Sequence, residues 1–238
     1  GIANQVNGAL NQFTSSVEKA FNPQIMKSEG MQNRGRVVSL SMLSTKYSSL
    51  IYGLFAIPLF VTLPYVLDIW LNNVPVHTVS FTRSILLSSL ISMKCVGLTS
   101  IFYATGEIKQ YLTKLGTMLI LLVFIAYVFM KMGFSADFVV GFLVLLEIIL
   151  LVLRIFYAHK IGKMKIEEYF RIVFMPCVKP ELLTYIAIIM IPCNNIWQFL
   201  TICIISLIVY ALATYLLSFS DSERNTVISL VNNKILKK

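Results

Sequence analysis

The sequence predicts an all-α membrane protein, a polytopic bundle of about seven transmembrane helices. Of its 238 residues, 57% are hydrophobic and only 13% are charged, whereas soluble domains carry about 25% charged residues. The apolar residues form long runs, which favour helical spans over the short alternating segments of a membrane barrel. The mean hydropathy of +0.79 agrees with this prediction.

The first predicted helix covers residues 1–21 and is amphipathic. Its polar face is rich in amides and almost uncharged, and comprises Asn4, Gln5, Asn7, Gly8, Asn11, Gln12, Ser15 and Glu18. The pattern is also typical of a surface helix in a soluble domain. In a chain this apolar, it favours a membrane helix that faces a polar lumen. We expect Asn22 and Pro23 to end this helix.

Six further spans are predicted, at residues 39–64, 79–104, 115–131, 138–159, 170–191 and 196–217. Pro58 and Pro64 should kink or end the first of these, and Pro176 and Pro180 should break the span 170–191. We therefore divide the chain into a partial transporter lobe of five spans (1–160), a terminal helix pair with an amphipathic linker (161–217) and a basic tail (218–238).

The basic residues between the spans alternate in number. The segments 19–38, 105–114, 160–171 and 218–238 hold 14 Lys or Arg residues, and the segments 65–80, 131–137 and 192–195 hold one. Cytoplasmic loops carry such an excess, so the sequence predicts a cytoplasmic C-terminus and a first helix that runs from outside to inside. The same placement explains the net charge of +9 without a nucleic-acid partner.

The span 79–104 carries Lys94 well inside it and Arg83 near one end, eleven residues apart and so on one face. A cation at that depth costs roughly 2.5–3.5 kcal/mol. One interpretation is the wall of a hydrated cavity for an anionic substrate. The other is an interhelical ion pair, such as Lys94 with Glu147. Lys46, in the first third of the span 39–64, is expected to snorkel to the headgroups.

Glu147 and Arg154 lie two turns apart on one face of the span 138–159. They could line the hydrated cavity or form a structural ion pair. The candidate residues of the substrate cavity are Lys94, Arg83, Asn4, Asn7, Asn11, Gln12, Glu147 and Arg154.

Sequence motifs of enzymes are missing. There is no phosphate-binding glycine loop, no HExxH and no GxSxG, and the four cysteines have no metal-ligand spacing. We therefore expect no catalytic residues, no metal, no cofactor and no enzymatic activity.

Three patches resemble a known family. GIANQVNGALNQF, followed by AFNPQIMKSEG, is similar to an amphipathic helix, an Asn-Pro and a basic loop in the multidrug/oligosaccharidyl-lipid/polysaccharide exporter superfamily. LPYVLDIWLNNVP (63–75) and FSDSERNTVISLVNNKILKK (219–238) resemble an external turn and the C-terminal tail of its polysaccharide and O-antigen flippases, the Wzx-like proteins. The resemblance covers nearly the whole chain.

The resemblance implies a fold of fourteen helices in two six-helix lobes plus a terminal pair. This chain, which lacks an initiator Met, would be helices eight to fourteen, and its partner would be the missing N-terminal lobe of the same protein. The implied function is a flippase of the bacterial inner membrane, which moves undecaprenyl-diphosphate-linked oligosaccharide for O-antigen or capsule biosynthesis.

Further partners implied by the resemblance are membrane lipids, a polysaccharide polymerase and a chain-length regulator. The alternative is a multidrug or cation exporter of the same fold, although such carriers favour acidic cavities. A membrane-embedded polymerase or ligase would need a large external loop, and no loop here exceeds about twenty residues.

Overall fold

The computed structural model describes residues 1–71 and 73–235, and these residues form helices without any strand. The α-helices are α1 (Ile2–Gly30), α2 (Arg34–Trp70), α3 (Thr78–Met93), α4 (Thr99–Thr105), α5 (Ile108–Lys131), α6 (Ala136–Gly162), α7 (Ile166–Tyr169), α8 (Met175–Ile189), α9 (Ile196–Ala213) and α10 (Asp221–Ile235). A 3-10 turn, η1 (Val96–Leu98), lies between α3 and α4. Two π-helical turns, η2 (Phe170–Phe174) and η3 (Thr214–Ser218), precede α8 and follow α9.

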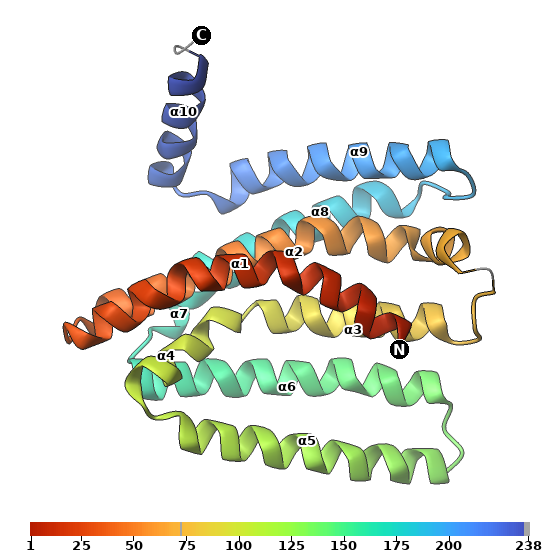
Figure 1. The fold of residues 1–238 in the computed structure, drawn as a ribbon, viewed down its shortest axis with the longest axis horizontal. Helices are drawn as coiled ribbons and strands as arrows, with labels where there is room; N and C mark the ends of the chain where they lie inside the picture. The colour runs from red at the N-terminus through yellow and green to blue at the C-terminus, as the bar shows by residue number, and fades with distance from the viewer. Residues whose placement is uncertain (72, 236–238) are drawn as a thin grey trace.

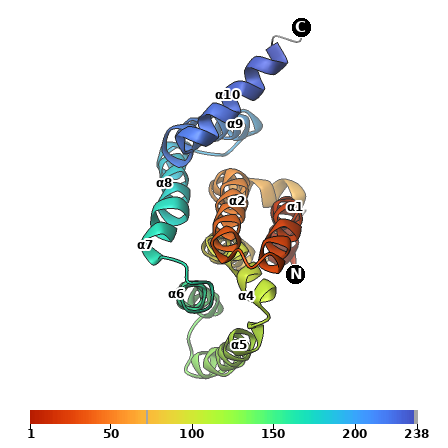
Figure 2. The ribbon, with the colours of Figure 1, turned by 90° about the vertical axis from the view of Figure 1, so that its left-hand side faces the viewer.

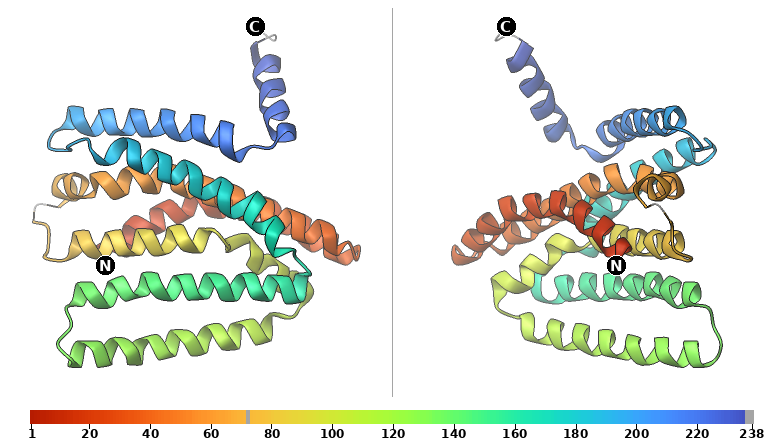
Figure 3. Two further views of the ribbon diagram at one scale, coloured as in Figure 1. Left: turned by 180° about the vertical axis from the view of Figure 1, so that it is seen from behind. Right: turned by 45° about the vertical axis from the view of Figure 1, so that its right-hand side comes forward.

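The long helices lie side by side in the order α5, α6, α3, α2, α8 and α9 (Figure 1). Helix α1 packs along α2 and α3, and in Figure 2 it lies on the opposite side of α2 from α8. Helix α2 is thus the centre of the bundle, with α5 and α9 at its edges. Helix α10 turns sharply away from α9 (Figure 3).

Five helical segments are long and apolar enough to cross a membrane, or six if α3 and η1–α4 form one bent span. This confirms the prediction of a helical bundle with several spans. The predicted count of seven is reached only if α1 is added to these six. Helix α1 has 29 residues, but it is too polar to be counted as a candidate membrane span.

The basic junctions gather at one end of the bundle. The junctions at residues 30–34, 105–108, 162–166 and 218–221 lie together on the left of Figure 1, and the N-terminus and the other connections lie on the right. We call the left-hand side the basic end. The alternation predicted from the sequence is therefore present in the fold.

Prolines do not end the helices, contrary to the prediction for Pro23 and Pro180; for Pro58 and Pro64 the prediction also allowed a kink. Helix α1 continues through Pro23, α2 continues through Pro58 and Pro64, and α8 continues through Pro180. A proline removes one backbone N–H and leaves the carbonyl four residues earlier without its helical donor. In two cases a side chain from another helix supplies the missing hydrogen bond.

Arg83 of α3 provides the first replacement donor. Its Nε lies 3.2 Å from the carbonyl oxygen of Phe60, which is four residues before Pro64. Ser218 provides the second, because its Oγ lies 2.5 Å from the carbonyl oxygen of Pro176, four residues before Pro180. The π-helical turn η2 ends at Phe174, two residues before Pro176. Its winding is wider than that of an α-helix, which relieves the clash between a proline and the carbonyl four residues earlier.

Replacing Ser218 with alanine should lower the free energy of unfolding by about 0.5–1.5 kcal/mol, because one net hydrogen bond is lost. In a Pro180→Ala background the backbone N–H of residue 180 returns, and the cost of Ser218→Ala should fall close to zero. Thermal unfolding of the four proteins in detergent measures this coupling. Equal costs in both backgrounds would show that the hydroxyl does not compensate for the proline.

Small side chains on α2 allow its neighbours to approach closely. The buried small residues of its packed faces are Ser41, Ser44, Thr45, Ser48, Ser49, Gly53 and Ala56. A Cβ at Gly97 of η1 would lie 2.6 Å from the carbonyl oxygen of Ser41, so here the two backbones are in direct contact. Small residues play this part in membrane helix packing generally.

Candidate functional site

Lys94 lies at a break in the third predicted span. The sequence predicts one helix over 79–104, but α3 ends at Met93 and the chain bends by 48° before it continues as η1 and α4. The carbonyl oxygen of Lys94 accepts a hydrogen bond from the hydroxyl of Tyr169, at 2.6 Å. The break is therefore stabilised by Tyr169 on one side and by the contact of Gly97 with α2 on the other.

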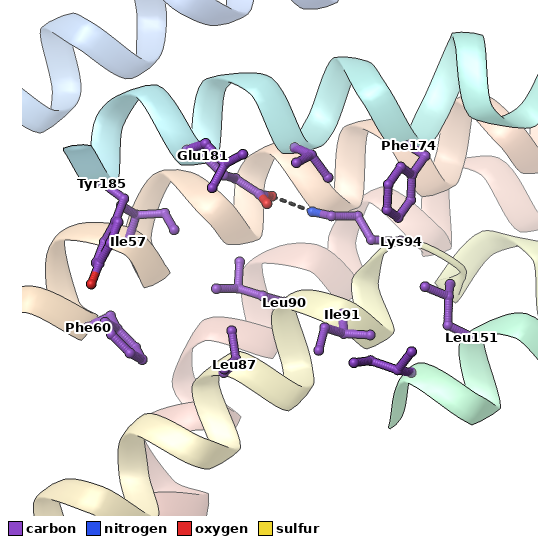
Figure 4. A pocket seen from close by; sticks show the side chains of 13 residues that line it. Ile57, Phe60, Leu87, Leu90, Ile91, Lys94, Leu151, Phe174, Glu181 and Tyr185 are labelled. Atoms are coloured by element: carbon purple, nitrogen blue, oxygen red, sulfur yellow. Dashed lines mark hydrogen bonds and ion pairs between the residues drawn. The ribbon is translucent and has the colours of Figure 1, made fainter. Parts of the chain in front are cut away.

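The side chain of Lys94 forms a buried ion pair with Glu181 of α8 (Figure 4). Its Nζ also donates a hydrogen bond to Ser49 Oγ at 2.7 Å. Lys94 is 4% exposed and Glu181 is 8% exposed. The suggested partner Glu147 is thus wrong. Glu181 is not among the sequence candidates although it is an acid in an apolar span, because Pro176 and Pro180 were expected to break that span.

A pocket of about 480 Å³ lies next to this ion pair, between α2, α3, α6 and α8. Apart from Lys94 and Glu181, the lining is apolar or aromatic: Ile57, Phe60, Leu87, Leu90, Ile91, Ile148, Leu151, Phe174, Val178, Leu182 and Tyr185. The expected polar wall is therefore not what surrounds Lys94. The pocket suits the hydrocarbon part of a ligand, with one ion pair at its edge (Figure 4).

Arg83 lies nearer the end opposite the basic end, where it lines a second pocket of about 390 Å³ with Pro64, Tyr65 and Asn194. Its guanidinium also lies over the ring of Phe60, 5.5 Å from the ring centre. Tyr185 lines both this pocket and the one at Lys94. The two cations therefore face the same side of α3, as their spacing predicted, but they do not share one cavity.

Glu147 and Arg154 form an ion pair within α6, at 2.7 Å. Arg154 also donates to the hydroxyl of Tyr111 at 3.0 Å and to Ser92 Oγ at 3.1 Å. Its Nη1 lies 3.2 Å from the sulfur of Cys95, directly after the helix break. Of the two roles left open for this pair, the geometry favours support of the break between α3 and η1.

The amide residues of α1 divide into two groups. Asn7 and Asn11 turn toward the bundle, where Asn7 Oδ1 accepts a hydrogen bond from Tyr52 at 2.8 Å. Asn11 Oδ1 is buried and has no hydrogen-bond partner among the described residues. Asn4 and Gln12 are exposed. The predicted polar face is therefore used partly for packing on α2 and partly as surface.

Lys46 does not snorkel as expected. It is 3% exposed, and its Nζ lies 2.6 Å from Glu223 of α10. Tyr47 donates to the other oxygen of Glu223, also at 2.6 Å. Glu223 in addition accepts from the backbone N–H of Ser220 at 2.7 Å, as an N-terminal cap of α10. This one carboxylate attaches the tail helix to the bundle.

Acidification should detach the start of α10. Burial by itself raises the pKa of Glu223, but hydrogen bonds from Lys46, Tyr47 and Ser220 outweigh it and hold the pKa below its ordinary value of 4.5. A lowered pKa means that the attachment is fully present above 4.5 and is lost as the pH falls through the lower folded-state value. The amides of residues 220–224 should exchange faster, relative to their intrinsic exchange rate at each pH, over that range. Glu223→Gln should remove this pH dependence. Unchanged exchange across this range would contradict the assignment.

No family model, no curated protein and no solved structure matches this chain. What the structure itself defines is a class. By the length and composition of its helices, the chain is a helical, multi-pass membrane protein.

Proposed function

We propose that this chain is the C-terminal portion of a flippase in the bacterial inner membrane, with its C-terminus in the cytoplasm. In this proposal α1 is a seventh span. The complete protein moves undecaprenyl-diphosphate-linked oligosaccharide across the membrane for surface polysaccharide biosynthesis, without breaking a bond. The N-terminal lobe, which precedes α1, supplies the other wall of the transport pathway.

The observation that carries this proposal is the exposed face of α1. Its exposed positions include Asn4, Gln5, Gly8 and Gln12, which are polar or small and uncharged, beside one exposed aromatic ring, that of Phe13. The exposed surfaces of α5, α6, α8 and α9 are instead apolar, with residues such as Ile120, Val152, Ile186 and Leu207. Amide side chains donate and accept hydrogen bonds, so this face suits the hydroxyl groups of a sugar.

The charges fit a lipid-linked anion better than a cationic drug. A cation exporter needs an acid that is free to bind its substrate, and the two mid-span acids are bound to Lys94 and Arg154. The same pairs occupy those two cations, so the cation left to meet an anion is Arg83, which lines a pocket and forms no ion pair among the described residues. The apolar pocket beside Lys94 also suits a hydrocarbon chain. These points support the flippase over the multidrug exporter of the same fold.

Transport by the complete protein tests the role of α1. The double variant Asn4→Leu/Gln12→Leu should lower the rate of glycolipid flipping by roughly tenfold, since each lost hydrogen bond contributes about 0.5–1.5 kcal/mol. The matched control is Thr113→Leu/Thr117→Leu, which replaces two exposed polar residues on α5. Equal transport by the two double variants would overturn the assignment of α1 to the pathway.

The cations are tested separately, with variants that leave no buried charge unpaired. Arg83→Ala and the neutral pair Lys94→Met/Glu181→Leu should each slow flipping of the diphosphate-linked substrate. If both proteins transport at the wild-type rate, neither cation assists the substrate, and their contribution is confined to the fold.

A further inference from the structure

A polar pocket of about 390 Å³ lies at the basic end, well away from Lys94. Arg34, Glu107, Lys160, Ile161 and Lys163 line it. These residues come from three places in the chain: the first turn of α2, the residue before α5, and the last turn of α6. The pocket is therefore formed by the tertiary fold.

The backbone that carries the two lysines is fixed by its surroundings. A Cβ at Gly162 would lie 3.0 Å from a methyl group of Ile101 of α4, so the end of α6 is closely packed. Lys163 adopts a left-handed conformation with φ of 56°, and its N–H donates to the carbonyl of Ala158. Nδ1 of His159 lies 2.8 Å from the carbonyl oxygen of Met164, which secures the following turn.

The charges in this pocket are unbalanced. Three cations face it against one acid, Glu107, and among residues 1–71 and 73–235 neither Lys160 nor Lys163 forms an ion pair. Arg34 bonds Glu29 at 2.8 Å, which leaves the lysines as the free positive charge. Lysine ammonium groups and arginine are the usual ligands of phosphate.

We propose that this pocket binds the phosphate of a phospholipid headgroup. The basic end is where the apolar helices finish, so a headgroup phosphate lies at this level while its chains extend along the exposed apolar faces of α5 and α6. Glu107, opposite the lysines, accepts a hydrogen bond from a headgroup hydroxyl. Phosphatidylglycerol offers both a phosphate and hydroxyl groups. The inference is independent of the proposed transport, because the site lies outside the substrate candidates.

Native mass spectrometry of the purified chain with added phosphatidylglycerol tests the proposal. Each lysine near a phosphate contributes roughly a fivefold factor in affinity, so Lys160→Ala/Lys163→Ala should weaken lipid binding by roughly 25-fold. The matched control is Lys109→Ala/Lys165→Ala, which removes the same charge at the same end from residues that do not line the pocket. It should change the affinity by less than about threefold.

Two further arms identify the source of the phosphate. Pyrophosphate that fails to displace the lipid supports the phospholipid assignment. Pyrophosphate that binds in place of the lipid overturns it in favour of a soluble phosphate. Equal loss in the two double variants, or no binding of either probe, would overturn the proposal. Circular dichroism of each variant checks that its helices are intact.

Discussion

Glu181→Leu is expected to lower the free energy of unfolding by about 3–5 kcal/mol, the largest effect of any single substitution proposed for this chain. Among the residues that the structure describes, the substitution leaves the buried ammonium of Lys94 with Ser49 as its only side-chain partner. An uncompensated charge in a site that is almost closed to solvent is costly, because burial removes the hydration that would stabilise it. Denaturant-induced unfolding in mixed micelles, followed by circular dichroism, measures the loss.

A double variant separates the charge from the packing. Lys94→Met/Glu181→Leu removes both charges, and it should recover most of the lost stability, because replacing a buried pair with apolar residues is often neutral. The matched control is Asp221→Asn, which removes the acid of the Arg224–Asp221 pair, a contact of 3.6 Å in which the Asp221 side chain is 97% exposed. We expect no measurable change there. A double variant as unstable as Glu181→Leu alone would show that packing, and not charge, holds α8 to α3.

Gly97→Ala is expected to destabilise the protein by about 1–3 kcal/mol, as overpacking does in a close-packed interior. The added Cβ would lie 2.6 Å from the carbonyl oxygen of Ser41 and 2.8 Å from the backbone N of Thr45. Both atoms belong to the backbone of the central helix α2, so they are unable to move aside as a flexible side chain does. The bend between α3 and α4 has to open for the methyl group to fit.

Gly116→Ala is the matched control, since the same methyl group is added to a different glycine. In the part of the chain that the structure describes, no atom outside the local backbone of α5 lies within 4 Å of a Cβ at Gly116. Alanine is the better helix former by about 0.5–1 kcal/mol, so this variant should be slightly more stable than the wild type. Thermal unfolding of the two variants side by side decides the matter. A Gly97→Ala protein as stable as Gly116→Ala would contradict the close contact of η1 with α2.

Local pattern was enough to predict most of the elements. The apolar runs predicted α6 and α9 close to where the structure has them, because long apolar stretches have one stable conformation in a membrane. For α5 they predicted the end at Lys131 but not the start, which lies at Ile108 and not at residue 115. Prolines misled the prediction of α1, α2 and α8. The rule that a proline ends a helix assumes that the freed carbonyl stays without a donor, and here Arg83 and Ser218 donate to two such carbonyls. Both donors lie far from their acceptors in sequence, so no local pattern reveals them.

The candidate site was predicted only in part. The depth of Lys94 in an apolar span identified it as a residue that needs a polar environment, and the spacing of Glu147 and Arg154 placed them on one face. The choice of Glu181 as the partner of Lys94, and of Glu223 as the partner of Lys46, depends on which helices become neighbours. A charged residue in an apolar span indicates that it needs a polar partner. The neighbouring sequence does not indicate which segment of the chain provides that partner.

The amino-acid sequence by itself determined that this chain forms apolar helices, that its basic residues gather at one end of them, and that certain charges are buried. These properties follow from transfer free energies and helical periodicity, which act residue by residue. The tertiary structure alone decided the helix break at Lys94, the apolar pocket beside it and the identity of each ion pair. Those features arise from close contacts between distant segments. At Gly97 the absence of a side chain lets η1 touch the backbone of α2, and at Gly53 it leaves room for the side chains of Tyr210 and Glu181.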